Sequence, residues 1–230
     1  MIQAWSYLIK LGQMKSLPLF LSMSVILPAF PVDTHLVPVL TDAEVQRMEA
    51  GEIIVREVDS PNPEGTAYEV VGLANAPGQV VYDVLIDYEA YPQFLSAVEK
   101  VETFNRAGEA TTLNYTLKPI LGFTKRYRVN IQDSAPEPGV WRVEWVQLEW
   151  PGLEPMETLA DTQGSWLILE RSPEQTLLRY YVYSDPGPIP FGLASVVKLL
   201  SKRSAGQAFA ETLDRVERQA AAWRQGNAGN

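Results

Sequence analysis

The chain of 230 residues contains no cysteine and a single histidine, His35. The missing cysteines exclude disulfides, a thiolate nucleophile and a cysteine-ligated metal site. A multi-histidine metal site and a serine–histidine–aspartate site are excluded as well, because the one histidine falls in a predicted linker. No spacing of aspartate and glutamate indicates a carboxylate metal site. The sequence therefore predicts no metal and no cofactor.

Basic residues are also scarce, since 19 lysines and arginines face 28 acidic residues and the net charge is −9. No consecutive basic run is present, and this argues against a nucleic-acid surface, which needs a positive field. Hydrophobic residues make up 46% of the chain and charged residues 20%, which is ordinary for a globular protein. The length suits one domain with an extra segment.

An uncharged apolar run, Leu17–Phe30, follows Lys10 and Lys15. A run of about 14 residues matches the core of a signal peptide and is short for a membrane span. Residues 1–29 are therefore interpreted as a signal peptide or N-terminal hydrophobic segment. The expected location is periplasmic or secreted, and an uncleaved segment that anchors the protein to a membrane is the alternative.

Residues 30–51 form a predicted linker followed by a short helix. Thr41 and Glu44 have the spacing of a capping box at the start of that helix, and Gly51 ends it. Apolar alternation and intervening turn residues then predict a series of strands. These are Glu52–Val58, Thr66–Leu73, Val98–Phe104, Thr111–Leu117, Lys125–Gln132, Val140–Glu149, Ser165–Glu170 and Thr176–Ser184.

The alternation predicts an antiparallel sheet with one apolar and one wet face. Its phase changes after Trp145, because Val146 and Leu148 then carry the apolar pattern, and a β-bulge near Val146 is expected. Phe191–Trp223 shows apolar residues at three- and four-residue spacing, which predicts a long amphipathic helix that covers the apolar face. Residues 224–230 are expected to form a flexible tail.

The segment Ala76–Phe94 carries the most specific pattern. Pro77 suits the first turn of a helix, apolar residues from Val80 to Leu85 follow at helical spacing, and Pro92 favours a second short helix. This succession of strand, Ala-Pro, short helix, Ile-Asp-Tyr and a proline before an aromatic residue resembles the START-like superfamily. That superfamily includes polyketide cyclase/dehydrase-like proteins and coenzyme Q-binding START domains.

The resemblance covers roughly residues 52–223 and implies an α+β helix-grip fold. In this fold a curved antiparallel sheet wraps around a long C-terminal helix, with two short helices after the first strands. The resemblance also implies a cavity for an apolar ligand. The residues predicted to line it are Leu113, Tyr115, Leu117, Tyr127, Val129, Trp141, Trp145, Trp166, Tyr180, Val182, Phe191, Val197 and Leu200. For any one of the aromatic residues, ordinary core packing is the competing interpretation.

Other charged pairs have plainer interpretations. Arg126 and Arg128 could bind an anionic headgroup, but alternation places them opposite Tyr127 on a solvated strand face. Asp83 and Asp87 could act as an acid–base pair, although surface positions, or a helix cap at Asp87, are preferred. The loops 117–124 and 185–192 are candidates for the cavity mouth.

The preferred function is binding of a hydrophobic small molecule such as a lipid, quinone or other isoprenoid in the cavity, with transport of that molecule as an extension that the sequence leaves open. No catalytic residue is assigned, because no histidine, cysteine or inward carboxylate pair is available to transfer protons. The alternative is a cyclase or dehydratase that acts on a polyketide-like substrate. Transient contact with a membrane is kept open, and the sequence does not decide the oligomeric state.

Overall fold

The computed structural model describes residues 39–108, 110–119, 122–188 and 194–227. The predicted signal segment 1–29 lies outside this range, and so does Phe191. The strands are β1 (Ile54–Val58), β2 (Thr66–Ala74), β3 (Val98–Ala107), β4 (Ala110–Leu117), β5 (Arg126–Glu137), β6 (Val140–Leu148), β7 (Asp161–Ser172) and β8 (Gln175–Asp185). The helices are α1 (Asp42–Glu49), α2 (Gly78–Ile86), the 3-10 helix η1 (Tyr88–Ala90), α3 (Tyr91–Phe94) and α4 (Ala194–Asn227).

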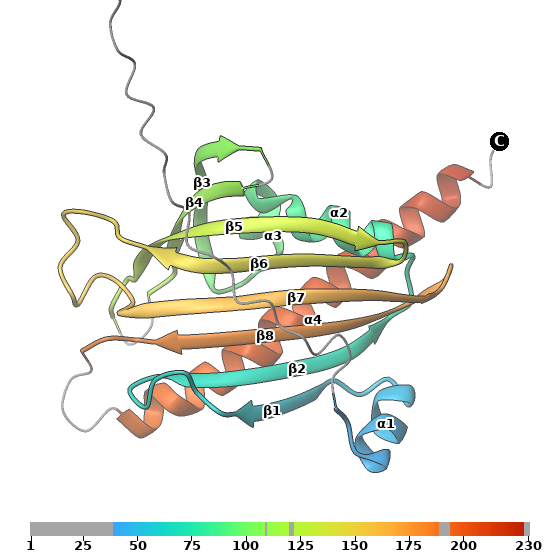
Figure 1. The fold of residues 1–230 in the computed structure, drawn as a ribbon, viewed down its shortest axis with the longest axis horizontal. Helices are drawn as coiled ribbons and strands as arrows, with labels where there is room; N and C mark the ends of the chain where they lie inside the picture. The colour runs from blue at the N-terminus through green and yellow to red at the C-terminus, as the bar shows by residue number, and fades with distance from the viewer. Residues whose placement is uncertain (1–38, 109, 120–121, 189–193, 228–230) are drawn as a thin grey trace, which may run out of the picture.

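All eight strands form one antiparallel sheet in the order β1-β2-β8-β7-β6-β5-β4-β3. Figure 1 shows the sheet with α4 crossing behind it and with α2 and α3 behind the β5 side. The helix α4 packs against β1, β2, α2 and α3. The predicted helix-grip fold is therefore confirmed. Within the described residues, no helix combines the length and the apolar character that crossing a bilayer requires.

The short helices form for local reasons. Thr41 and Glu44 make the predicted capping box, in which the Thr41 hydroxyl accepts from the Glu44 amide and the Glu44 carboxylate accepts from the Thr41 amide. Pro77 is the N-cap of α2, and Pro92 lies in the first turn of α3. Asp87 precedes η1, but its side chain makes no capping hydrogen bond, so the predicted cap at Asp87 is wrong.

The core lies between the concave face of the sheet and the helices. It includes Val81 and Leu85 of α2, Leu113 of β4 and Phe209 of α4, all of them fully or almost fully buried. A smaller cluster on the opposite face joins Met48 of α1 to sheet residues Val71 and Leu177. The convex face is therefore not wet along its whole length, because α1 covers one end of it.

The predicted bulge near Val146 is wrong. The pairing of β6 with β5 and with β7 continues without a shift through Trp145 and Val146. An irregularity in the pairing of β5 with β6 lies instead between Ser134 and Glu137, where Pro136 cannot donate to the ladder. The strand β5 continues past this irregularity to Glu137, five residues further than predicted.

The helix α4 extends to Asn227, four residues beyond its predicted end at Trp223. The arginine Arg224, expected in a flexible tail, donates a hydrogen bond of 2.6 Å to the carbonyl of Asn75. This contact joins the last turn of α4 to the connection between β2 and α2. The C-terminal end of α4 is therefore held against the chain that connects β2 to α2.

Candidate functional site

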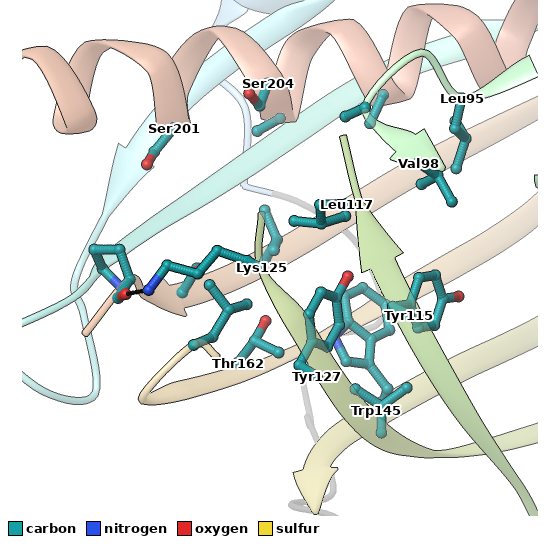
Figure 2. Close-up of a pocket in the computed structure, with 18 of the residues that line it drawn as sticks. Leu95, Val98, Tyr115, Leu117, Lys125, Tyr127, Trp145, Thr162, Ser201 and Ser204 are labelled. Atoms are coloured by element: carbon teal, nitrogen blue, oxygen red, sulfur yellow. Dashed lines mark hydrogen bonds between the residues drawn. The ribbon is translucent and has the colours of Figure 1, made fainter. Parts of the chain in front are cut away.

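A cavity of about 340 Å³ lies between the concave face of the sheet and the first half of α4. Figure 2 shows Ser201 and Ser204 on α4 on one side of it, and Tyr115, Tyr127 and Leu117 on the other. The volume falls within the usual range for small-molecule pockets. The cavity exists because the curved sheet and the long helix enclose more space than their side chains fill.

The alternation of the strands delivers most of the predicted lining. The predicted residues that line the cavity are Tyr115, Leu117, Tyr127, Val129, Trp145, Trp166, Tyr180, Val182 and Val197. Since side chains alternate along a strand, the inward positions of β4, β5, β6, β7 and β8 meet on the same face. Their role in ligand binding stays a prediction.

Two predicted residues that the structure describes do not line the cavity. Leu113 is completely buried and packs in the core cluster that contains Val81 and Leu85. Trp141 packs on α2, where its ring stacks on Tyr82 with 6.3 Å between centroids and lies against Gly78. Both side chains point to the concave face, but Trp141 lies under α2 and Leu113 lies within the packed core. Phe191 lies outside the described residues, and so does the side chain of Leu200.

Sequence reasoning missed the contribution of β2, α3 and the small residues of α4. Thr66 and Tyr68 of β2 and Tyr91 of α3 line the cavity. The other missed positions on the helix are Ser201, Ser204, Ala205 and Ala208. Alternation along β2 could have identified the first two, because that strand was predicted correctly. The helix positions give no signal of their own, since small residues on an apolar stripe also occur wherever helices pack closely.

The aromatic side chains of the cavity form two groups. In the first, the rings of Tyr115 and Tyr127 are parallel with centroids 5.1 Å apart, and Tyr91 lies 6.4 Å from Tyr115. In the second, Tyr180 stacks on Trp166 at 4.3 Å and on Trp145 at 6.0 Å. Gly164 makes room for this group, because a side chain there would overlap the Trp145 indole and the Tyr181 carbonyl.

One end of the cavity opens between three loops. The Lys125 ammonium donates to the carbonyl of Thr158 at 2.7 Å and to that of Pro186 at 3.0 Å, and so it ties the loops after β6 and β8 to the start of β5. Figure 2 shows the bond from Lys125 to Pro186. Phe123 and Met156 line the same opening and are 39% and 36% exposed. The predicted mouth loops thus do border the cavity.

The charged residues that the sequence offers as candidates for binding or catalysis do not line the cavity. Arg126 pairs with Glu157 at 2.8 Å, and Arg128 donates to Asn114 and stacks on the Phe104 ring at 3.9 Å. Both arginines belong to the outer face, as the alternation predicts. Asp83 and Asp87 are exposed and do not line the cavity. Among the described residues, no group of three histidine, cysteine, aspartate or glutamate side chains could hold a metal ion.

Comparison with known proteins finds a matching family model and solved structures of similar fold. The family model described as polyketide cyclase / dehydrase and lipid transport matches residues 74–187. Residues 74–187 therefore match a family of the START-like superfamily, which is the resemblance that the sequence predicts. A search of curated proteins finds no match.

Several solved structures share the START-like fold. A STAR-related lipid transfer protein from Xanthomonas axonopodis has a TM-score of 0.61 at 13% identity, covering 71% of this chain and 93% of its own. The Zhui aromatase/cyclase from Streptomyces sp. R1128 has a TM-score of 0.55 at 17% identity, covering 72% and 96%. Human STARD10 has a TM-score of 0.57 at 18% identity, covering 84% and 86%. Identities this low support the fold alone.

The tyrosines of this START-like cavity are held in their neutral form. Burial raises the pKa of Tyr115, Tyr127 and Tyr180 above the ordinary value of 10.0. For Tyr115 the neighbouring Tyr91 and Tyr127 raise the pKa further, since two phenolates in contact would repel each other. At neutral pH these side chains are hydrogen-bond donors and not bases.

These pKa shifts predict a loss of stability at alkaline pH. Above pH 10 the unfolded chain releases the tyrosine protons while the folded chain retains them, so the free energy of unfolding should fall as the pH rises. Tyrosinate absorbance should show the buried tyrosines ionising only together with unfolding, followed by circular dichroism. The chain unfolded in guanidinium is the control. Titration of all ten tyrosines near pH 10 in the folded state would contradict the prediction.

Proposed function

We propose that the protein binds a hydrophobic small molecule, such as a lipid, quinone or other isoprenoid, in the cavity under α4 and carries it without chemical change. The observation behind the proposal is the cavity itself, which is lined mainly by apolar and aromatic side chains. The lipid-transfer proteins among the structural relatives add support. Among these ligands, a ubiquinone-type molecule is the most specific one that we propose.

The apolar walls can supply the affinity. Removal of about 300 Å² of ligand surface from water at ~25 cal/mol/Å² gives roughly 7 kcal/mol before the costs of association. Affinity in the micromolar range therefore needs no charged contact. Such a pocket discriminates weakly between chains of similar width.

A cyclase or dehydratase is the second candidate. The family description names polyketide cyclases, and the Zhui aromatase/cyclase shares the fold. Against this candidate, no described residue that lines the cavity is a histidine, aspartate or glutamate. The tyrosines are poor acids at neutral pH because burial raises their pKa. The carrier function is therefore preferred.

Export is part of the proposal. The apolar run Leu17–Phe30 after Lys15 supports a periplasmic or secreted protein, with membrane attachment as the alternative. Sequencing the N-terminus of the protein from its native host should find a chain that begins near residue 30. A soluble cytoplasmic chain that begins at Met1 or Met14 would contradict export. The exposed Phe123 and Met156 beside the mouth support transient contact with a membrane during loading.

Native mass spectrometry of the protein purified from its own host tests the carrier function. The expected result is one co-purified apolar molecule that is unchanged after incubation with the protein. A co-purified molecule that the protein converts to a cyclised or dehydrated product would favour the enzyme. A protein that neither retains nor binds any apolar molecule would exclude both functions.

The mouth gives a kinetic prediction. Lys125→Met keeps the aliphatic stem and removes the hydrogen bonds to Thr158 and Pro186, so the loops should separate more often. Because each hydrogen bond contributes about 1 kcal/mol, the release of a bound neutral fluorophore, 1-aminoanthracene, should accelerate by roughly three- to tenfold. Stopped-flow fluorescence measures the rate. Lys202→Met, on an exposed position of α4, is the control, and equal rates in both variants would contradict the prediction.

A further inference from the structure

We propose that the cavity selects an uncharged ligand that carries an acceptor oxygen, such as a ketone, ester or quinone carbonyl, and rejects anionic amphiphiles of the same chain length. The proposal rests on the proposed carrier function and names the class of ligand for that site. It follows from two features of the lining, its lack of counter-charge and its unpaired hydroxyl groups.

The lining offers almost no counter-charge to an anion. Among the described lining residues, Lys125 is the only one with a charged side chain at neutral pH. Its ammonium lies at the mouth and already donates to the carbonyls of Thr158 and Pro186. The carboxylate of Asp185 interacts electrostatically with the same ammonium, and Asp161 lies close enough to interact with Asp185. A carboxylate or phosphate that passes the mouth would meet no cation and would lose its hydration.

The hydroxyl groups of the lining fall into two sets. One set is paired within the chain, since Tyr68 donates to Lys198, Tyr91 to Leu85 and Thr162 to Tyr183, each time to the backbone carbonyl. These hydroxyls hold the walls together and are not available to a ligand.

The second set is free. Among the described residues, the hydroxyls of Tyr115, Tyr127 and Tyr180 make no hydrogen bond within the chain, and they are not among the polar atoms sealed inside the protein, so they face the cavity that they line. They belong to both aromatic groups, so donors are present on two parts of the wall. A ligand that covers these hydroxyls without accepting their hydrogens leaves buried donors unpaired, which is costly, and a ligand oxygen that accepts a hydrogen removes that cost. An alkyl chain alone would leave these donors unpaired.

The two features act together. A neutral phenol donates to an oxygen without carrying a charge, so it favours a carbonyl group but cannot neutralise a carboxylate. The charge of the ligand therefore has the larger effect on affinity, and the presence of an acceptor oxygen has the smaller one. The apolar walls bind the alkyl chain in either case.

Isothermal titration calorimetry with decan-2-one and decanoate at pH 8 tests the proposal on the full-length protein. The two probes have equal chain length and differ in charge. Decan-2-one is expected to bind at least about 100-fold more tightly, which corresponds to the several kcal/mol cost of burying an unpaired ion. Ser204→Lys places an ammonium on the cavity side of α4 and is expected to strengthen decanoate binding at least about tenfold.

The role of the hydroxyls is tested by Tyr127→Phe combined with Tyr180→Phe. This double variant keeps both rings and should weaken decan-2-one binding roughly tenfold. Tyr183→Phe is the matched control with unchanged affinity, because Tyr183 lies on the same strand as Tyr180 but outside the cavity lining.

Four results would overturn the proposal. Equal affinity of the natural protein for the two probes would overturn the selection by charge and leave the carrier function intact. Decanoate binding that Lys125→Met abolishes would show an anion site at the mouth. An unchanged affinity of the double tyrosine variant for decan-2-one would overturn the role of the hydroxyls. If neither probe binds, the carrier function fails together with the proposal.

Discussion

Replacement of Phe209 by alanine is expected to lower the free energy of unfolding by about 3–5 kcal/mol, the usual cost of deleting a buried aromatic side chain. Phe209 is completely buried in α4, and its ring stacks on Trp166 of β7 with centroids 5.5 Å apart. It also fills the space above Gly72 of β2, where any Cβ would lie 2.8 Å from the ring. One side chain thus joins the helix to two strands of the sheet.

Urea denaturation at neutral pH measures the effect of Phe209→Ala. The matched control is Trp223→Ala, because Trp223 lies on the same helix but is 53% exposed. The control should change the free energy of unfolding by less than about 0.5 kcal/mol. If Phe209→Ala costs less than about 1 kcal/mol, α4 is not held to the sheet by this contact.

The largest effect on binding is expected from Ala208→Trp. Ala208 lies on the side of α4 that lines the cavity, so an indole at this position would fill much of the 340 Å³. Ligand affinity should fall at least about 100-fold, because the apolar surface that the ligand buries would already be covered. Stability should change little, since the new side chain occupies empty space and not a packed core.

The control for this variant is Ala210→Trp, two residues further along α4 and exposed to solvent. It introduces the same side chain outside the cavity and should leave the affinity unchanged. Calorimetry with decan-2-one and thermal unfolding of both variants give the two readouts. Unchanged affinity of Ala208→Trp would place the ligand elsewhere on the protein.

Much of the fold could be predicted from the sequence because its patterns are local. The strands and the capping box at Thr41 follow from alternation and from the three-residue spacing to Glu44. The predicted bulge near Val146 is wrong, because the apolar residues after Trp145 do not all turn toward the core. On the outer face, the Arg128 guanidinium lies 3.9 Å from the centroid of the Phe104 ring. The same group lies 5.3 Å from the centroid of the Trp150 ring. Apolar side chains are thus accommodated there without a change of register.

The cavity lining could be predicted only in part, because it depends on how α2 and α4 are placed over the sheet. Leu113 and Trp141 have the correct strand face, yet Trp141 packs on Tyr82 of α2 and Leu113 packs in the core, so neither borders the cavity. Conversely, Ser204 and Ala208 line the cavity because α4 crosses the sheet with its small residues inward. Alternation gives the face of a strand but not the position along it at which a covering helix ends.

The order of the strands has a consequence for synthesis of the chain. The strand β2 pairs with β8, as in Thr66 with Ser184, so the two segments of the sheet join only after more than a hundred further residues have been made. The cover of the concave face comes later still, with α4 from Ala194 onward. Because a chain emerges from the ribosome N-terminal end first, Tyr127, Trp145 and Trp166 are synthesised well before their cover. A growing chain that has reached only Pro188 therefore exposes an aromatic surface and is at its greatest risk of aggregation.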